Sequence, residues 1–126
     1  MKKRNIYLII AGVLNLFTAL LHLIGGQVGL VEPMQESSMT WAEKTQLLGV
    51  WHMVTALLFY SSFILLKKGF KGHPHSKGIV TFIGVSYLLY GLGFVGASVY
   101  LLQFAPQWTL LIPIGALALI GQRKMA

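Results

Sequence analysis

Four long apolar runs dominate this chain, and almost all of its charged residues lie in the gaps between them. The runs cover about residues 6–30, 46–66, 78–102 and 106–121. Since a helix rises ~1.5 Å per residue, roughly 20 residues cross a hydrocarbon core of about 30 Å. None of the runs alternates apolar with polar residues, as strands of a membrane barrel must. The sequence therefore predicts an all-α, polytopic membrane protein, folded as a four-transmembrane-helix antiparallel bundle in one domain, 1–126.

The composition excludes several other classes of protein. Only 10% of the residues are charged and 56% are hydrophobic, whereas a soluble domain carries about 25% charged residues. The net charge of +7 does not indicate nucleic acid, because the basic residues sit beside apolar runs, where they contact lipid headgroups. Cysteine is absent, which excludes disulfides and thiolate metal sites.

The sign of the charges in each gap predicts which side of the membrane it occupies. Glu32, Glu36 and Glu43, the only acids, all lie in the gap between the first two runs. Basic residues cluster at both chain ends and in the Lys-rich loop, 67–77. By the positive-inside rule these three basic segments are cytoplasmic. We therefore expect a multi-pass protein of the inner (plasma) membrane with both termini in the cytoplasm and anionic lipid at the Lys-rich loop.

Two histidines lie within the predicted spans, each among polar or small residues. Asn15, Thr18 and His22 follow an i, i+3, i+7 spacing and share one helix face. His52 shares a face with Thr55 in the second span. Counted along the two helices at ~1.5 Å per residue, both histidines lie about 6–8 Å below the outer edge of the core. This depth match predicts that His22 and His52 approach each other in the outer half of the bundle.

A neutral imidazole pair of this kind is a common metal or haem ligand. Glu43 could complete a set of two histidines and one carboxylate, which would suit a transition metal. The candidate metal ligands are thus His22, His52 and Glu43. Each histidine could equally form only a hydrogen bond to a hydroxyl or carbonyl of a neighbouring helix.

Further polar side chains are predicted to line the same site. Asn15 lies nearer mid-membrane, and its amide needs a partner such as Tyr60, Tyr87 or Tyr90. It could act there as a clamp between helices or as a contact to substrate. The ligand-binding candidates are His22, His52, Asn15, Thr18, Thr55, Tyr87 and Tyr90.

The third run is rich in small residues, including Gly84, Gly91, Gly93 and Gly96. Small residues let helix backbones approach closely in lipid, so we interpret this run as a tight helix seam. The segments His22-x-x-Gly25-Gly26 and Trp51-His52 broadly resemble those of small four-helix bacterial inner-membrane proteins. That resemblance implies the same fold and membrane, and no particular activity.

Three functions remain open from the sequence. In the first, a small integral membrane protein binds a metal, haem or small ligand at the His22/His52 polar site. In the second, it is an accessory or structural subunit of a larger membrane complex. In the third, it is an oligomeric transporter or channel for small solutes. The chain has no phosphate loop, H-E-x-x-H or G-x-S-x-G motif, so an enzyme acting on a lipophilic substrate is the least favoured alternative.

Overall fold

The computed structural model describes residues 4–71 and 77–125, and all regular structure in that part of the chain is helical. The first helical stretch comprises α1 (Ile6–Leu20), two π-helical segments, η1 (Leu21–Gly25) and η2 (Gln27–Val31), and α2 (Glu32–Glu36). It is followed by α3 (Trp41–Lys71), α4 (Lys77–Leu101) and α5 (Trp108–Arg123). The predicted all-α fold with four helices is confirmed. Residues 72–76 of the Lys-rich loop lie outside the described residues.

Three of the helical stretches are long and apolar enough to cross a membrane: Ile6–Glu36, Trp41–Lys71 and Lys77–Leu101. The fourth, α5, has 16 residues, or about 24 Å at ~1.5 Å per residue, less than a hydrocarbon core of about 30 Å. The chain is therefore compatible with a membrane protein.

A capping box explains why α3 begins five residues before the predicted start at residue 46. The Thr40 amide donates to Glu43 Oε2 at 2.8 Å, and the Glu43 amide donates to Thr40 Oγ1 at 3.3 Å. These bonds satisfy backbone donors that the first turn of a helix leaves unpaired. Glu43 is exposed, and its carboxylate accepts a hydrogen bond from the Thr40 amide at the start of α3.

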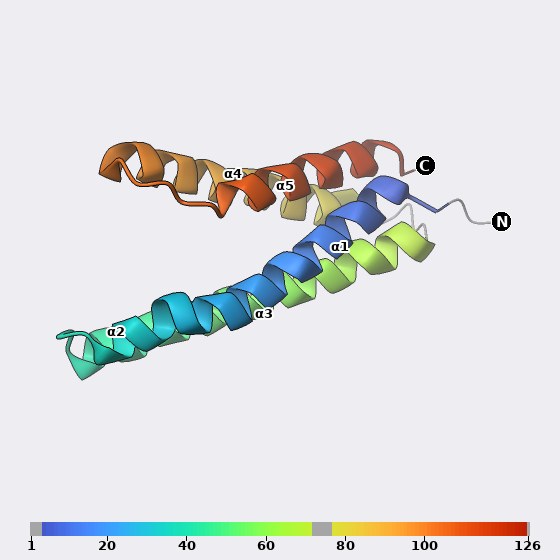
Figure 1. Cartoon of the computed structure of the whole chain (residues 1–126). Helices are drawn as coiled ribbons and strands as arrows, with labels where there is room; N and C mark the ends of the chain where they lie inside the picture. Colours follow the sequence, from blue (N-terminus) through green and yellow to red (C-terminus); the bar gives the residue numbers. More distant parts are fainter. Residues whose placement is uncertain (1–3, 72–76, 126) are drawn as a thin grey trace.

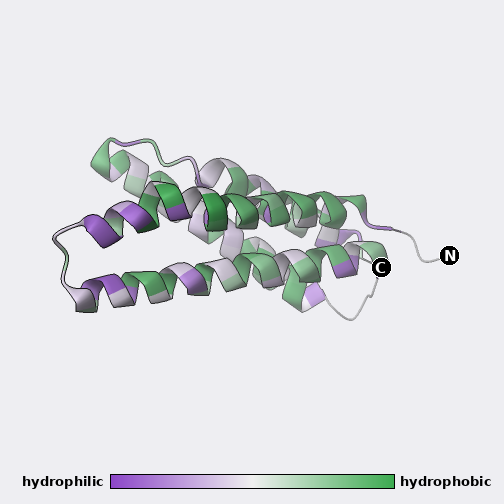
Figure 2. Ribbon diagram, turned by 60° about the horizontal axis from the view of Figure 1, so that its bottom comes forward, coloured by the Kyte–Doolittle hydropathy of each residue, from purple (hydrophilic) through white to green (hydrophobic). Residues whose placement is uncertain are grey.

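The helices form two pairs, α1 with α3 and α4 with α5 (Figure 1). The pairs are joined mainly through α1 and α5, whereas α3 and α4 barely touch. We call the end that holds Asn5, Lys71, Lys77 and Arg123 the terminal end, and the opposite end, with α2 and residues 102–107, the loop end. The pairs lie close together at the terminal end and diverge toward the loop end (Figure 1). Apolar residues make up most of the length of the helices, and polar residues gather toward the ends (Figure 2).

Glycines allow the close approach of α4 and α5. A Cβ atom on Gly115 would lie 2.8 Å from the backbone oxygen of Gly84. A Cβ atom on Gly91 would lie 2.5 Å from the side chain of Ile112. The interpretation of the third run as a tight seam is thus confirmed at Gly84 and Gly91. At Gly93 and Gly96, by contrast, a Cβ atom would meet no described atom within 4 Å.

Asn5 ties three helix ends together at the terminal end. Its backbone amide donates to the Gly69 carbonyl at 2.8 Å, and its side-chain amide donates to the Gly121 carbonyl at 2.8 Å. Its side-chain oxygen also accepts from the Leu8 amide, which caps α1. Carbonyl groups in the last turn of a helix lack a full set of donors within the helix, so Asn5 supplies donors to the last turns of α3 and α5.

Candidate functional site

A cyclic hydrogen-bond network of three side chains links α1, α3 and α4 in the middle of the molecule. Asn15 Nδ2 donates to Ser61 Oγ at 2.9 Å, and the Tyr87 hydroxyl donates to Asn15 Oδ1 at 2.8 Å. Ser61 Oγ lies 2.7 Å from the Tyr87 hydroxyl and closes the ring. The three residues are only 0%, 2% and 1% exposed, respectively. We call this set the central network.

The central network has its polar groups satisfied internally. Asn15 Nδ2 uses its second proton for the Leu58 carbonyl at 3.1 Å. Ser62, next in the chain, donates to the Gly12 carbonyl at 2.7 Å and adds a second polar link between α1 and α3. Buried groups with full hydrogen bonding rigidify a core and offer little to a ligand. These contacts therefore favour a role of Asn15 as a clamp between helices over a role as a contact to substrate.

The helix pairs separate on the loop-end side of the central network. There α4 continues well past the start of α5, and residues 102–107 run back along it as a non-helical segment (Figure 1). Leu102, with a φ of 52°, ends α4 in the left-handed conformation, and the Gln103 amide bonds back to the Ser98 carbonyl. Ser98 Oγ accepts from the Ala105 amide at 3.0 Å.

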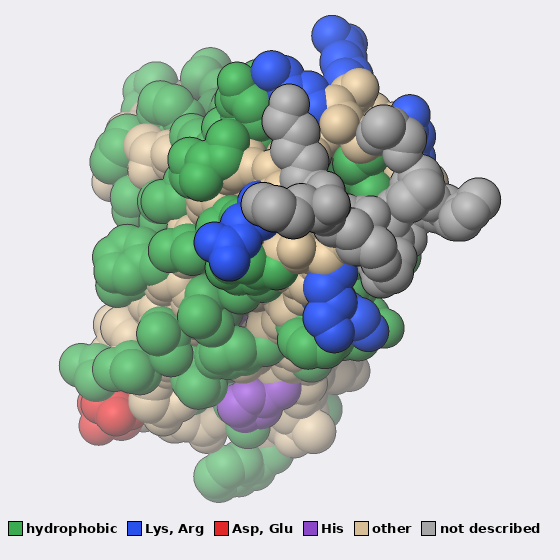
Figure 3. Space-filling view, turned by 90° about the vertical axis from the view of Figure 1, so that its right-hand side faces the viewer, with side chains coloured by type: hydrophobic (Ala, Val, Ile, Leu, Met, Phe, Trp, Pro, Cys, Tyr) green, Lys and Arg blue, Asp and Glu red, His purple; other side chains and the backbone are tan. Residues whose placement is uncertain are grey.

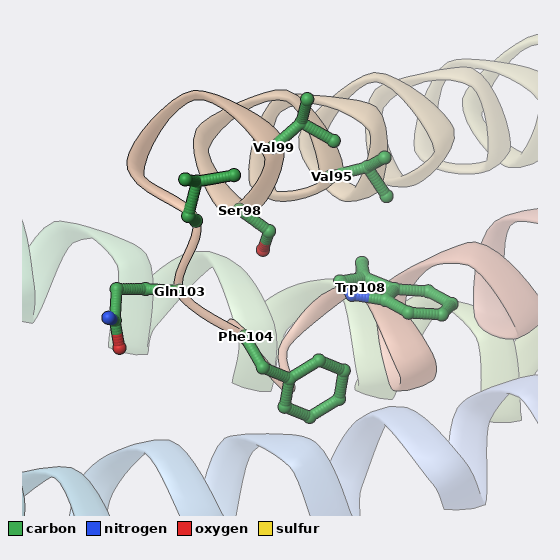
Figure 4. A pocket seen from close by; sticks show the side chains of 7 residues that line it. Val95, Ser98, Val99, Gln103, Phe104 and Trp108 are labelled. Carbon is green, nitrogen blue, oxygen red and sulfur yellow. The ribbon is translucent and has the colours of Figure 1, made fainter.

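An open apolar pocket lies at this turn. Its volume is about 310 Å³. Phe104 and Trp108 lie on one side of the pocket and α4 lies on the other (Figure 4). The rings of Phe104 and Trp108 pack edge to face, with their centroids 6.1 Å apart. The full lining is Val95, Ser98, Val99, Leu102, Gln103, Phe104 and Trp108.

His22 lies in the π-helical segment η1, where it packs on Trp51 of α3. The two rings are stacked with centroids 3.7 Å apart. His22 Nε2 donates to the Trp51 carbonyl at 3.2 Å, which leaves Nδ1 as the nitrogen available to a ligand. A Cβ atom on Gly26 would collide with the Trp51 ring, so glycine is required one turn further along. The indole Nε1 of Trp51 is buried and has no hydrogen-bond partner among the described residues.

The structure places Trp51, and not His52, against His22. His52 is exposed on α3. Glu43 is held in its capping box, two and a half turns from His52 along α3. Among the described residues no three His, Cys, Asp or Glu side chains form a metal-binding group, so the predicted set of His22, His52 and Glu43 is not assembled.

The remaining predicted site residues differ in their contacts. Thr18 Oγ1 donates to Leu14 and Thr55 Oγ1 to Trp51, in each case to a carbonyl of its own helix. Tyr87 belongs to the central network. The Tyr90 ring lies 6.0 Å from that of Tyr87 and is partly exposed.

The sequence analysis missed two residues: Ser61 of the central network and Trp51, which packs on His22. Ser61 lies close to the helix face of Leu58, and a serine in an apolar span is a natural partner for a buried asparagine on a neighbouring helix. Trp51 is not among the residues predicted for the site. The available signal was its position one residue before His52. Neighbouring residues on a helix point about 100° apart, so the rotation of the helix decides which of the two faces His22.

No protein-family model matches the chain, and no curated protein or solved structure is detectably similar to it.

Proposed function

We propose that the protein is a four-span integral protein of the plasma membrane, with both termini in the cytoplasm, and that it serves as an accessory subunit of a membrane complex. Its length and apolarity support insertion. The gathering of basic residues at the terminal end supports the orientation, by the positive-inside rule.

The divergence of the helix pairs toward the loop end is the observation that carries this proposal (Figure 1). Toward the loop end the described helix pairs lie apart, and large apolar side chains on both pairs are exposed (Figure 1). Five glycines on these surfaces would place a Cβ atom with no described atom within 4 Å: Gly25, Gly29, Gly49, Gly93 and Gly96. Such small residues allow a transmembrane helix of another chain to approach closely.

His52 gives a second reason to expect a partner on this surface. Its side chain is exposed near the loop end of a helix that is long and apolar enough to span the membrane. Polar side chains inside a membrane usually face a protein partner or a water-filled cavity, because exposure to lipid is costly. A donor or acceptor on a docked helix would satisfy the imidazole.

Photo-crosslinking in native membranes tests the proposal with a matched pair of positions on α4. Val99 lies near the loop end and Val85 lies almost four turns nearer the terminal end, roughly on the same helix face; both are exposed. We expect a photoreactive residue at Val99 to give a discrete protein adduct and the same residue at Val85 to give none. Gly96→Leu should reduce the Val99 adduct at least about tenfold, because its side chain blocks close approach.

Two results would contradict the proposal. Equal adduct yields at Val85 and Val99 would mean that the loop-end surface is not special. An adduct larger than the chain by only its own 13.9 kDa would identify a second copy, and the protein would then be a homo-oligomer.

A ligand centre at His22 is the second candidate function. The stack on Trp51 and the bond from Nε2 fix the ring and leave Nδ1 as a possible ligand atom, an arrangement typical of metal-binding histidines. If this is the function, protein purified from its own membrane should contain about one equivalent of transition metal or show a haem absorption band. His22→Ala should remove it, and Thr18→Val, which changes only a bond within α1, should not. A metal-free, colourless wild-type protein rejects this candidate.

A further inference from the structure

We propose that the terminal end is a composite binding surface for the headgroups of anionic phospholipids, built from three segments far apart in the sequence. The inference rests on membrane insertion as proposed above, and not on any partner at the loop end. It extends the expected lipid contact from the Lys-rich loop to both ends of the described chain.

Seven described cations gather at the terminal end, and Figure 3 views the molecule from this side, where Lys and Arg side chains are prominent. They are Arg4, Lys67, Lys68, Lys71, Lys77, Arg123 and Lys124. All three acids of the chain lie in the first loop-end segment, residues 32–43. The side-chain acids therefore lie at the opposite end of the molecule from these seven described cations.

The contacts around Asn5 bring these cations together. Because Asn5 bonds to both Gly69 and Gly121, the start of α1 lies against the ends of α3 and α5. The positive charges of Arg4, Lys71 and Arg123 thus belong to one surface. Both α3 and α5 also point their C-terminal ends here, which favours cations in their last turns.

Aromatic rings hold two of the cations in place across helix boundaries. The Arg4 guanidinium lies 5.9 Å from the centroid of Phe70 on α3. The Lys124 Nζ atom lies 4.7 Å from the ring of Tyr7 on α1. Such pairs fix the charged group beside an apolar surface instead of leaving it free in solvent.

Exposed apolar side chains lie directly beside the charges, and they distinguish a lipid from other anions. Ile6, Phe70 and Ile79 are each about half exposed at this end. A ligand that satisfies both features has a phosphate next to an acyl chain. An anionic phospholipid has this structure, whereas free phosphate has no apolar group that could pack against these side chains.

Lipid binding by the purified full-length chain in neutral detergent tests the inference. Native mass spectrometry should show phosphatidylglycerol bound roughly tenfold more tightly than phosphatidylcholine of the same acyl chains, and excess inorganic phosphate should not displace it. Each of Lys71→Gln and Arg123→Gln should weaken phosphatidylglycerol binding about fivefold, the expected effect of one surface charge. The double variant Glu32→Gln with Glu36→Gln, at the other end, should bind as the wild type does.

The effect of Arg123→Gln decides between a composite surface and the loop alone. If only Lys71→Gln weakens binding, the site is local to the Lys-rich loop and the inference is wrong. Equal binding of the two lipids, or displacement by inorganic phosphate, also overturns it. Failure to crosslink at Val99 would leave this result unaffected, so the two proposals fail separately.

Discussion

Asn15→Leu is expected to lower the free energy of unfolding by about 2–3 kcal/mol. Leucine has the same number of side-chain heavy atoms and the same branching as asparagine but makes none of its three hydrogen bonds to Leu58, Ser61 and Tyr87. The Tyr87 hydroxyl and the Leu58 carbonyl would each lose a partner in a region shielded from water. Denaturant titration in detergent micelles, followed by circular dichroism, measures the change.

Thr18→Val is the matched control on the same helix. Thr18 bonds only to the carbonyl of Leu14 within its own helix, so its loss should cost less than about 0.5 kcal/mol. A double-mutant cycle of Asn15→Leu with Tyr87→Phe should show coupling, because both changes remove the same bond. If Asn15→Leu costs no more than Thr18→Val, the central network does not clamp the helices.

Gly115→Ala is expected to destabilise the protein by about 2–3 kcal/mol through overpacking. Its Cβ atom would lie 2.8 Å from the Gly84 carbonyl oxygen and 3.0 Å from the backbone nitrogen of Leu88. Since both atoms belong to the backbone of α4, no rotamer change relieves the contact and the two helices must move apart. Thermal unfolding in micelles reports the loss.

Gly93→Ala provides the opposite expectation at another glycine of the same helix pair. No described atom of another helix lies within 4 Å of its Cβ position, and alanine favours a helix over glycine by about 0.5–1 kcal/mol. This variant should therefore be as stable as the wild type or slightly more stable. Equal losses at Gly93 and Gly115 would show that glycine content, and not the α4–α5 seam, determines stability.

The helices could be predicted because the residues that form them are adjacent in the chain. Apolar length predicted four helices, and the bounds of α4 and α5 lie within two residues of the prediction. In contrast, α3 extends five residues further at each end, and the T-x-x-E pattern of Thr40 and Glu43 marks its true start. The end of α4 was within one residue of the prediction. The non-helical course of residues 103–107 beside α4 was not predicted, because it depends on Ser98 accepting from the Ala105 amide.

The candidate site was predicted only in part. Tyr87 is one of three tyrosines predicted as partners of Asn15, and the structure selects it. Depth along each helix correctly placed His22 beside the helical turn that holds residues 51 and 52. Whether it meets Trp51 or His52 depends on how far each helix is rotated, and the rise per residue says nothing about rotation.

The sequence by itself determined the number of helices, their apolar surfaces and the separation of acids from bases, because each depends on local composition. Only the tertiary structure decided that Trp51 covers His22, that Asn15, Ser61 and Tyr87 form one network, and that the helix pairs separate beyond it. These depend on helix rotation and on which glycines let backbones approach, and both are set by packing between segments distant in the chain.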